Sequence, residues 1–171
     1  MTPERRKYVV FGVLSALMII ADQWTKMLAR QHLGVATKAV LGHYVTFRLS
    51  ENSGVAFGML QRLPGGRIWL TLVALGAFAL VIHYLRRTPA NLVRLHVALG
   101  LVGGGAIGNV LDRLLYGSVT DFLVVDLGFW PLNPWPAFNV ADAALVVGVL
   151  LMVLDVFSSS KPVATVPAKD S

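Results

Sequence analysis

The sequence contains no cysteine and few charged residues. Without cysteine, the chain has no disulfide, no thiolate metal ligand and no cysteine nucleophile. Charged residues make up 14% of the chain, against about 25% in typical soluble domains, and hydrophobic residues make up 56%. This composition excludes intrinsic disorder and an ordinary soluble domain, and it indicates a membrane protein surrounded by membrane lipids.

The sequence also lacks patterns typical of nucleic-acid or metal binding. Its 15 lysines and arginines give a net charge of +6, but they are spread among long apolar runs and form no DNA- or RNA-reading motif. The four histidines follow no metal-ligand spacing such as HExxH. We therefore expect no nucleic-acid partner and no bound metal.

Four apolar stretches are each long enough to cross a bilayer, which takes about 20 mostly apolar residues. The predicted membrane-spanning helices cover residues 8–27, 68–85, 95–115 and 140–157. A cleaved signal peptide is the alternative interpretation of the first stretch, because basic residues precede it. No convincing small-residue cleavage site follows, so we expect one four-helix membrane domain over residues 1–157. The remaining residues, 158–171, are expected to form a disordered cytoplasmic tail.

Basic residues predict how the chain is oriented in the membrane. Arg5, Arg6 and Lys7 precede the first span, and residues 86–94 contain three arginines, whereas residues 116–138 contain no lysine or arginine. Because basic flanks stay in the cytoplasm, both termini are predicted to be cytoplasmic. All four tryptophans then fall at the outer interface, where indole rings are enriched; they are Trp24, Trp69, Trp130 and Trp135.

The two outer loops, residues 28–67 and 116–138, predict a small β-sheet on the outer membrane face. Residues 44–49 alternate partly between apolar and polar side chains, and residues 119–127 are rich in β-branched and apolar ones. The proline- and tryptophan-rich segment 129–136 cannot be helical, and we expect it to contact lipid headgroups. The predicted fold class is therefore a mainly α membrane protein with four transmembrane helices and a small extracytoplasmic β-sheet.

Four carboxylates converge on the outer end of the predicted bundle. The first span ends near Asp22, and the third ends near Asp112. The fourth span begins near Asp142, and Asp121 lies in the loop before it. Because intramembrane carboxylates are costly, each one near a span is a candidate for function.

Helical spacing gathers further polar residues at the same end. Asn109, Asp112 and Arg113 stand at i, i+3 and i+4, so they share one face of the third span. Asn139 and Asp142 are three residues apart at the start of the fourth span. The glycines that precede this polar face allow another helix to approach the third span closely.

Asp121 and Asp142 are the best candidates for a pair of catalytic carboxylates. Two carboxylates that share one proton form the device of aspartic peptidases, in which one remains protonated and the other deprotonates a water. The proton belongs to the pair and not to either residue. Neither aspartate has a basic neighbour within four residues that would neutralise it.

Structural interpretations remain open for the other polar residues. Asp22 and Lys26 are also explained as an interfacial pair whose lysine reaches the membrane surface. Asp112 and Arg113 are also explained as a structural ion pair. Asn139 is also explained as the N-cap of the fourth helix.

Five short motifs follow one another along the chain. They are Asp22-Gln23-x-x-Lys26, Glu51-Asn52-Ser53-Gly54-Val55-Ala56-Phe57, Gly104-Gly105-Ala106-Ile107-Gly108-Asn109-x-x-Asp112-Arg113, Val119-Thr120-Asp121-Phe122 and Phe138-Asn139-Val140-Ala141-Asp142. In this order, on a four-span chain of this length, they resemble the bacterial lipoprotein signal peptidase family, also called signal peptidase II. The chain departs mildly from the family at Glu51 and Ser53, where Tyr or Arg and Thr are common.

The resemblance implies an aspartic endopeptidase of the bacterial inner membrane. Such a hydrolase removes the signal peptide from prolipoproteins by cleaving just before the diacylglyceryl-modified cysteine, with Asp121 and Asp142 as the catalytic dyad. The resemblance also implies residues that bind substrate or support the site: Asp22, Lys26, Asn52, Gly54, Gly108, Asn109, Asp112, Arg113, Asn139 and Ala141. It implies inhibition by globomycin-type cyclic peptides and no metal or organic cofactor, and we expect a monomer.

Two functions of other classes are also compatible with aspartates near spans. A small proton-coupled transporter predicts polar residues that continue to the inner side, whereas here the second span is almost uniformly apolar. A non-catalytic lipid-binding scaffold predicts that Asn is tolerated at Asp121 and Asp142. The peptidase interpretation predicts that it is not.

Overall fold

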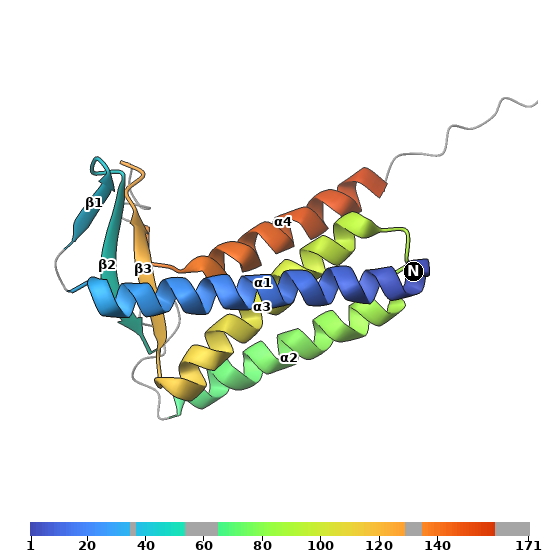
Figure 1. Cartoon of the computed structure of the whole chain (residues 1–171), viewed down its shortest axis with the longest axis horizontal. Helices are drawn as coiled ribbons and strands as arrows, with labels where there is room; N and C mark the ends of the chain where they lie inside the picture. The colour runs from blue at the N-terminus through green and yellow to red at the C-terminus, as the bar shows by residue number, and fades with distance from the viewer. Residues whose placement is uncertain (35–36, 54–64, 129–134, 160–171) are drawn as a thin grey trace, which may run out of the picture.

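The computed structural model describes residues 1–34, 37–53, 65–128 and 135–159. Four long helices form a bundle, and three strands form a sheet at one end of it (Figure 1). The helices are α1 (Pro3–His32), α2 (Gly66–Arg87), α3 (Val93–Leu115) and α4 (Val140–Ser159). The strands are β1 (Lys38–Leu41), β2 (Val45–Asn52) and β3 (Val119–Val125). All four helices are long and apolar enough to cross a membrane, which confirms the predicted fold class.

The bundle has two chemically distinct ends. The sheet lies where α1 and α3 finish and where α2 and α4 begin, and the N-terminus lies at the opposite end (Figure 1). At the N-terminal end, Thr2 caps α1 by accepting a hydrogen bond from the backbone N–H of Arg5 at 3.3 Å. The buried Lys7 donates to the carbonyl oxygen of Thr88 at 3.1 Å, so it ties α1 to the end of α2.

Helix α3 is the central helix because its glycines allow two neighbours to approach it. A Cβ atom on Gly104 would lie 2.7 Å from the Cβ of Met18 in α1. A Cβ atom on Gly105 would lie 2.5 Å from the carbonyl oxygen of Ala141 in α4. The helices therefore pack backbone to backbone, as small residues permit within membranes.

We expect Gly105→Ala to destabilise the protein by about 1–3 kcal/mol, the usual cost of overpacking a close helix contact. The added methyl would meet backbone atoms of α4, which cannot rotate away. Gly76→Ala in α2 is the matched control, because a Cβ there would meet no atom of another described helix or strand within 4 Å. Thermal unfolding in detergent would measure both variants, and equal melting temperatures would contradict the close packing.

The sheet is antiparallel throughout, with β2 between β1 and β3. Asp121 in β3 lies opposite Ser50 in β2. Phe138 forms a bridge with Leu123, and this bridge connects the sheet to the start of α4. The expected sheet is thus present, but sequence reasoning missed β1, a strand of four exposed residues.

Large apolar side chains cover the outside of the bundle. On α1 they form a stripe at helical spacing, and the exposed residues are Val9, Val13, Leu17, Ile20 and Trp24. Trp24, Trp69 and Trp135 are all exposed toward the sheet end. Trp130, Gly54, most of the predicted aromatic segment and all but the first two residues of the predicted tail lie outside the described residues.

Candidate functional site

Polar side chains from five elements meet where the bundle joins the sheet. The elements are α1, α3, α4, β2 and β3, three of which begin or end at this level (Figure 1). One connected network of hydrogen bonds and ion pairs includes the four carboxylates that the sequence placed at this end, namely Asp22, Asp112, Asp121 and Asp142.

Asp121 is buried on the strand that runs beside the bundle. Its side chain accepts two hydrogen bonds, one from Asn139 Nδ2 at 2.7 Å and one from Asn52 Nδ2 at 3.1 Å. Only 2% of the residue is exposed. The carboxylate is therefore held from two sides by amide groups that carry no charge.

The environment of Asp121 favours its protonated form. Burial and, secondarily, the negative charge of Asp142 raise the pKa of Asp121 from 3.8 to about 6. The hydrogen bonds from Asn52 and Asn139 act in the opposite direction but do not cancel the rise. This carboxyl can thus hold a proton at a pH where most aspartates are ionised.

Asp142 is fixed by the first turn of α4. Its backbone N–H donates to Asn139 Oδ1 at 3.0 Å, and its carboxylate accepts from the backbone N–H of Asn139 at 3.2 Å. This reciprocal pair is a capping box, with aspartate in the place usually taken by glutamate or glutamine. The other carboxylate oxygen accepts from Asn109 Nδ2 at 2.8 Å. Asp142 is partly exposed, in contrast to Asp121.

Asn139 connects the two aspartates. Its side-chain amide donates to Asp121, and its side-chain oxygen accepts from the backbone of Asp142. The same amide lies 3.2 Å from Asn109 Oδ1. The N-cap interpretation of Asn139 is therefore correct but incomplete, because this cap also binds the second carboxylate.

A buried lysine neutralises the carboxylates beneath this pair. Lys26 Nζ lies 2.8 Å from Asp22 Oδ2 and 3.4 Å from Asp112 Oδ2, and it donates to Asn109 Oδ1 at 2.9 Å. The side chains of Lys26 and both aspartates are 0% exposed. The pair of Asp22 and Lys26 is therefore present, but the interpretation that its lysine reaches the membrane surface is wrong, because this lysine points into the bundle.

The expected ion pair between Asp112 and Arg113 is also wrong. Neighbouring residues on a helix do not face one another. The Asp112 carboxylate instead contacts Lys26 and Arg30, the latter at 3.5 Å, and accepts from the backbone N–H of Thr120 at 2.7 Å. Arg113 donates to the carbonyl oxygen of Asn109 at 3.3 Å.

Two small residues of the expected set allow this network to form. A Cβ atom on Gly108 would lie 2.6 Å from Asp22 Oδ2, so only glycine leaves room for that carboxylate. Ala141 is fully buried, and its backbone N–H donates to Asp22 Oδ1 at 3.0 Å. Asp22 thus accepts a hydrogen bond at the N-terminus of α4, where negative charge is favoured.

Sequence reasoning did not assign roles to three residues of the network. Gln23 Nε2 donates to Asp112 Oδ1 at 3.2 Å, and Arg30 donates to Thr120 Oγ1 at 2.6 Å. Arg30 follows Asp22 and Lys26 at steps of four residues, so helical spacing alone could have placed it on the same face. Thr120 gave no such signal, because its contacts come from other segments.

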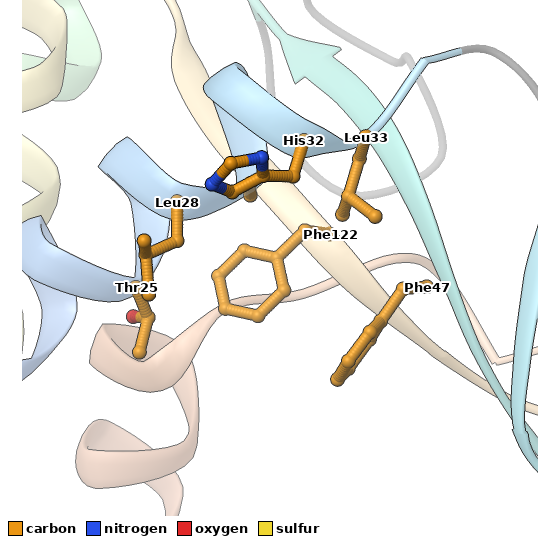
Figure 2. Close-up of a pocket in the computed structure, with 7 residues that line it drawn as sticks. Thr25, Leu28, His32, Leu33, Phe47 and Phe122 are labelled. Carbon is orange, nitrogen blue, oxygen red and sulfur yellow. The ribbon is translucent and has the colours of Figure 1, made fainter.

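Two apolar cavities flank the network. One, of about 320 Å³, extends from Asp142 along α4 and is lined otherwise by apolar and aromatic side chains, namely Trp135, Phe138, Ala143, Val146 and Val147. The other, of about 310 Å³, lies between the last turns of α1 and the sheet, where Phe122 and Phe47 face it (Figure 2). Only the first cavity contains a carboxylate of the network.

The chemistry available here is that of paired carboxylates. Asp121 and Asp142 offer one buried and one partly exposed carboxyl, connected through one asparagine. Among residues 1–34, 37–53, 65–128 and 135–159, no group of three or more His, Cys, Asp or Glu could hold a metal ion. The described part of the site is suited to proton transfer to and from a water beside an apolar cavity.

Comparisons with known proteins identify the family of this chain. A family model described as signal peptidase II matches residues 14–158. The lipoprotein signal peptidase of Shewanella amazonensis is 39% identical over 145 residues, which is 84% of each chain. That of Acinetobacter baumannii strain ATCC 17978 is 38% identical over 149 residues, covering 86% of this chain and 83% of the relative.

Solved structures share the fold. A bacterial membrane enzyme determined in meso at 2.3 Å superposes with a TM-score of 0.76 and 25% identity, over 90% of this chain and 93% of the other. A second, at 1.9 Å, gives a TM-score of 0.77 over 88% and 94% of the two chains. The chain therefore belongs to the signal peptidase II family, the bacterial membrane hydrolases that remove signal peptides from lipoproteins.

Proposed function

We propose that this protein cleaves prolipoproteins just before their diacylglyceryl-modified cysteine, with Asp121 and Asp142 as an aspartic dyad. The observation that carries the proposal is the joint fixation of the two carboxylates by Asn139, which binds one with its amide and caps the helix of the other. Membership of the signal peptidase II family supports the substrate class.

In this mechanism the two carboxyls divide the acid and base roles. Asp121, whose pKa is raised to about 6, holds the shared proton and donates it to the carbonyl oxygen of the scissile bond as the water attacks the carbonyl carbon. Asp142 takes a proton from the attacking water and passes it to the leaving amine nitrogen as the C–N bond breaks. Proton positions exchange within the pair during the cycle, so both residues are required.

The surrounding residues hold the substrate and the dyad. Asn52 and Asn109 orient one aspartate each, and we propose that both residues also line the substrate pocket. Arg113 is proposed to stabilise negative charge that develops at the peptide carbonyl. A second group of residues is proposed to support these side chains from within the bundle, namely Asp22, Lys26, Asp112, Gly108 and Ala141. Gly54 is proposed to border the pocket.

The apolar cavity beside Asp142 supports the proposal that the substrate is lipidated. Its walls are side chains of α4 and the segment before it, so it offers hydrocarbon-like surface next to the proposed base. A signal helix in the membrane would bring its scissile bond to this level. We therefore propose that acyl chains of the substrate are buried against this cavity and the surrounding lipid, which compensates for few peptide contacts.

We also propose the orientation and partners that the sequence predicts. Arg5, Arg6, Arg86, Arg87 and Arg94 lie toward the end of the bundle opposite the network (Figure 1). By the positive-inside rule, that end with both termini is cytoplasmic, and the site faces the outer side of the bacterial inner membrane. A globomycin-type cyclic peptide would occupy the same pocket, and the enzyme would act as a monomer without a cofactor.

The test is cleavage of a prolipoprotein by the purified protein in lipid. We expect release of the signal peptide from the diacylglyceryl-modified substrate, and at least about 100-fold slower cleavage of the same chain without the lipid, because binding energy from remote groups contributes to rate. A gel shift with mass spectrometry of the new terminus would measure both. Equal rates on the two substrates would contradict the proposed role of the acyl chains.

A further inference from the structure

Thr120, the residue before Asp121, is held at every polar atom by a different segment. Its backbone N–H donates to Asp112 Oδ2 at 2.7 Å, and its hydroxyl accepts from Arg30 at 2.6 Å. Its carbonyl oxygen accepts from Asn139 Nδ2 at 3.3 Å. Only 4% of the residue is exposed. Three elements, α1, α3 and the start of α4, thus fix one residue of β3.

Strand geometry places Thr120 and Asp121 on opposite faces of the sheet. Side chains alternate along a strand, so Thr120 and Phe122 point to one face and Asp121 to the other. Thr120 meets Arg30 of α1, and Phe122 faces the last turns of the same helix. Asp121 points instead toward Asn52 and Asn139. The contact of Arg30 with Thr120 therefore acts on the Asp121 carboxylate through the backbone of β3.

Apolar packing on the α1 face is incomplete beside Phe122. The ring of Phe122 borders the cavity of about 310 Å³, opposite Leu28 and Thr25 (Figure 2). The Thr25 hydroxyl donates within its own helix, to the Ala21 carbonyl oxygen at 2.8 Å. On this face, the hydrogen bond from Arg30 to Thr120 therefore ties β3 to α1 beside an unfilled space.

Arg30 is itself rigidly placed. Its guanidinium lies 4.0 Å from the centre of the Tyr116 ring and 3.5 Å from Asp112 Oδ1. A planar guanidinium stacked on a ring and paired with a carboxylate loses little further freedom when it donates a hydrogen bond. Arg30 and Asp112 therefore hold the hydroxyl and the N–H of Thr120 as one unit.

We propose that Arg30 and Thr120 are positioning residues that fix Asp121 at its working distance from Asp142. This inference rests on the proposed function, because the distance matters only if the two aspartates react as a pair. Neither residue touches the reacting atoms; Arg30 acts through Thr120, and Thr120 acts through the backbone of β3.

The test compares the variants Thr120→Val and Thr120→Ser in the cleavage assay on lipidated substrate. Valine keeps the branched shape but removes the acceptor for Arg30, and we expect kcat to fall about tenfold while KM changes less than about twofold, since a small misplacement of a catalytic group lowers the rate of the chemical step. Serine retains the hydroxyl, so we expect it to restore kcat to within about twofold of the original enzyme.

Thr88→Val is the matched control. Like Thr120, Thr88 is a buried threonine whose hydroxyl takes part in a hydrogen bond; it donates to the Tyr84 carbonyl oxygen at 2.8 Å. Thr88 lies at the opposite end of the bundle. A loss of stability alone would affect both valine variants. We expect only Thr120→Val to lower kcat at a temperature where both are folded.

A second measurement does not need substrate. NMR of protein labelled with ¹³C at aspartate carboxyls, assigned with Asp121→Asn, would follow the titration of Asp121. The groups that face this carboxyl are Asp142 from α4, Lys26 from α1 and Arg113 from α3. If Thr120→Val lets Asp121 move away from Asp142 and toward water, the pKa of Asp121 falls from about 6 toward 3.8.

The outcomes separate this inference from the function on which it rests. An inactive original enzyme would overturn the proposed function and the inference with it. An active original enzyme with an unchanged kcat and an unchanged Asp121 titration in Thr120→Val would overturn the inference alone. A lower kcat that serine does not restore would also overturn it, because shape and not the hydrogen bond would then be responsible.

Discussion

Replacing Asp121 by asparagine is expected to abolish cleavage, with a loss of about 10³-fold or more in kcat, as when a residue of an acid–base pair is removed. The amide retains the shape of the carboxyl, but it keeps only one of the two oxygens that accept hydrogen bonds from Asn139 and Asn52, and it cannot carry the shared proton. Asp142→Asn should have an equally large effect, since the two carboxyls act as a unit. A gel assay for the released signal peptide would measure both.

The control is an aspartate at the same end of the bundle whose side chain has a local contact. Asp126 accepts from the backbone N–H of Gly128 at 2.8 Å and lies just beyond the end of β3. We expect Asp126→Asn to cleave at the original rate. Activity within about tenfold of the original in Asp121→Asn or Asp142→Asn would contradict the dyad and move the base to another carboxylate, Asp112 first.

The same substitution should also change how stability depends on pH. The folded protein raises the pKa of Asp121 from 3.8 to about 6, so the folded state binds the proton more tightly than the unfolded chain. The stability associated with this proton is therefore fully present below pH 3.8 and is lost as pH rises toward 6. Asp121→Asn has no such proton to lose.

We therefore expect the unfolding free energy of Asp121→Asn, relative to the original protein, to rise by about 2–3 kcal/mol between pH 4 and pH 7.5. Unfolding curves in detergent at the two pH values would give this difference, whatever constant cost the amide adds. A pH-independent difference would show that Asp121 is not perturbed. The expected rise would mean that the site keeps a poorly solvated carboxyl at a cost in stability, as functional sites commonly do.

The sequence alone predicted that four carboxylates gather at one end of the bundle, and the structure brings them together there, because the evidence for this was local. A carboxylate near the end of an apolar run needs a polar environment, so Asp22, Asp112 and Asp142 mark one end of the bundle whatever the details of packing. Helical spacing likewise placed Asn109 and Asp112 on one face. Four spans and a small sheet followed from apolar runs and from β-branched segments of the loops between them.

Individual partners could not be predicted, because they depend on contacts across elements. Asp112 has an arginine as its next neighbour in sequence, but its cations come from α1, which lies 80 or more residues earlier. The contacts of Thr120 depend on how β3 crosses α1 and α4. Strand β1 was not predicted, because a strand of four exposed residues has no alternating pattern of apolar and polar side chains.

Replacing Lys26 by methionine is expected to cause the largest loss of stability, about 3–5 kcal/mol, the usual cost of breaking a buried ion pair from one side. Methionine fills most of the space of lysine but removes the only cation within 3 Å of Asp22 among the described residues. Asp22 and Asp112 would remain fully buried, with fewer partners for their charge. Unfolding curves in detergent at neutral pH would measure the loss.

Lys38→Met provides the matched control, because Lys38 is exposed and its amine contacts only the His32 carbonyl oxygen at 3.1 Å within the described part of the chain. Its stability should change by less than about 0.5 kcal/mol. The double variant Lys26→Met/Asp22→Asn should recover part of the loss, since it removes one of the carboxylates left without a cation. The contrary result is additivity: the unfolding free energy of the double variant would then lie below that of Lys26→Met by as much as Asp22→Asn alone lowers it in the original protein. In that case the two charges would not be coupled. The buried pair would then owe its place in the bundle to packing, and the dyad above it would not depend on its charge.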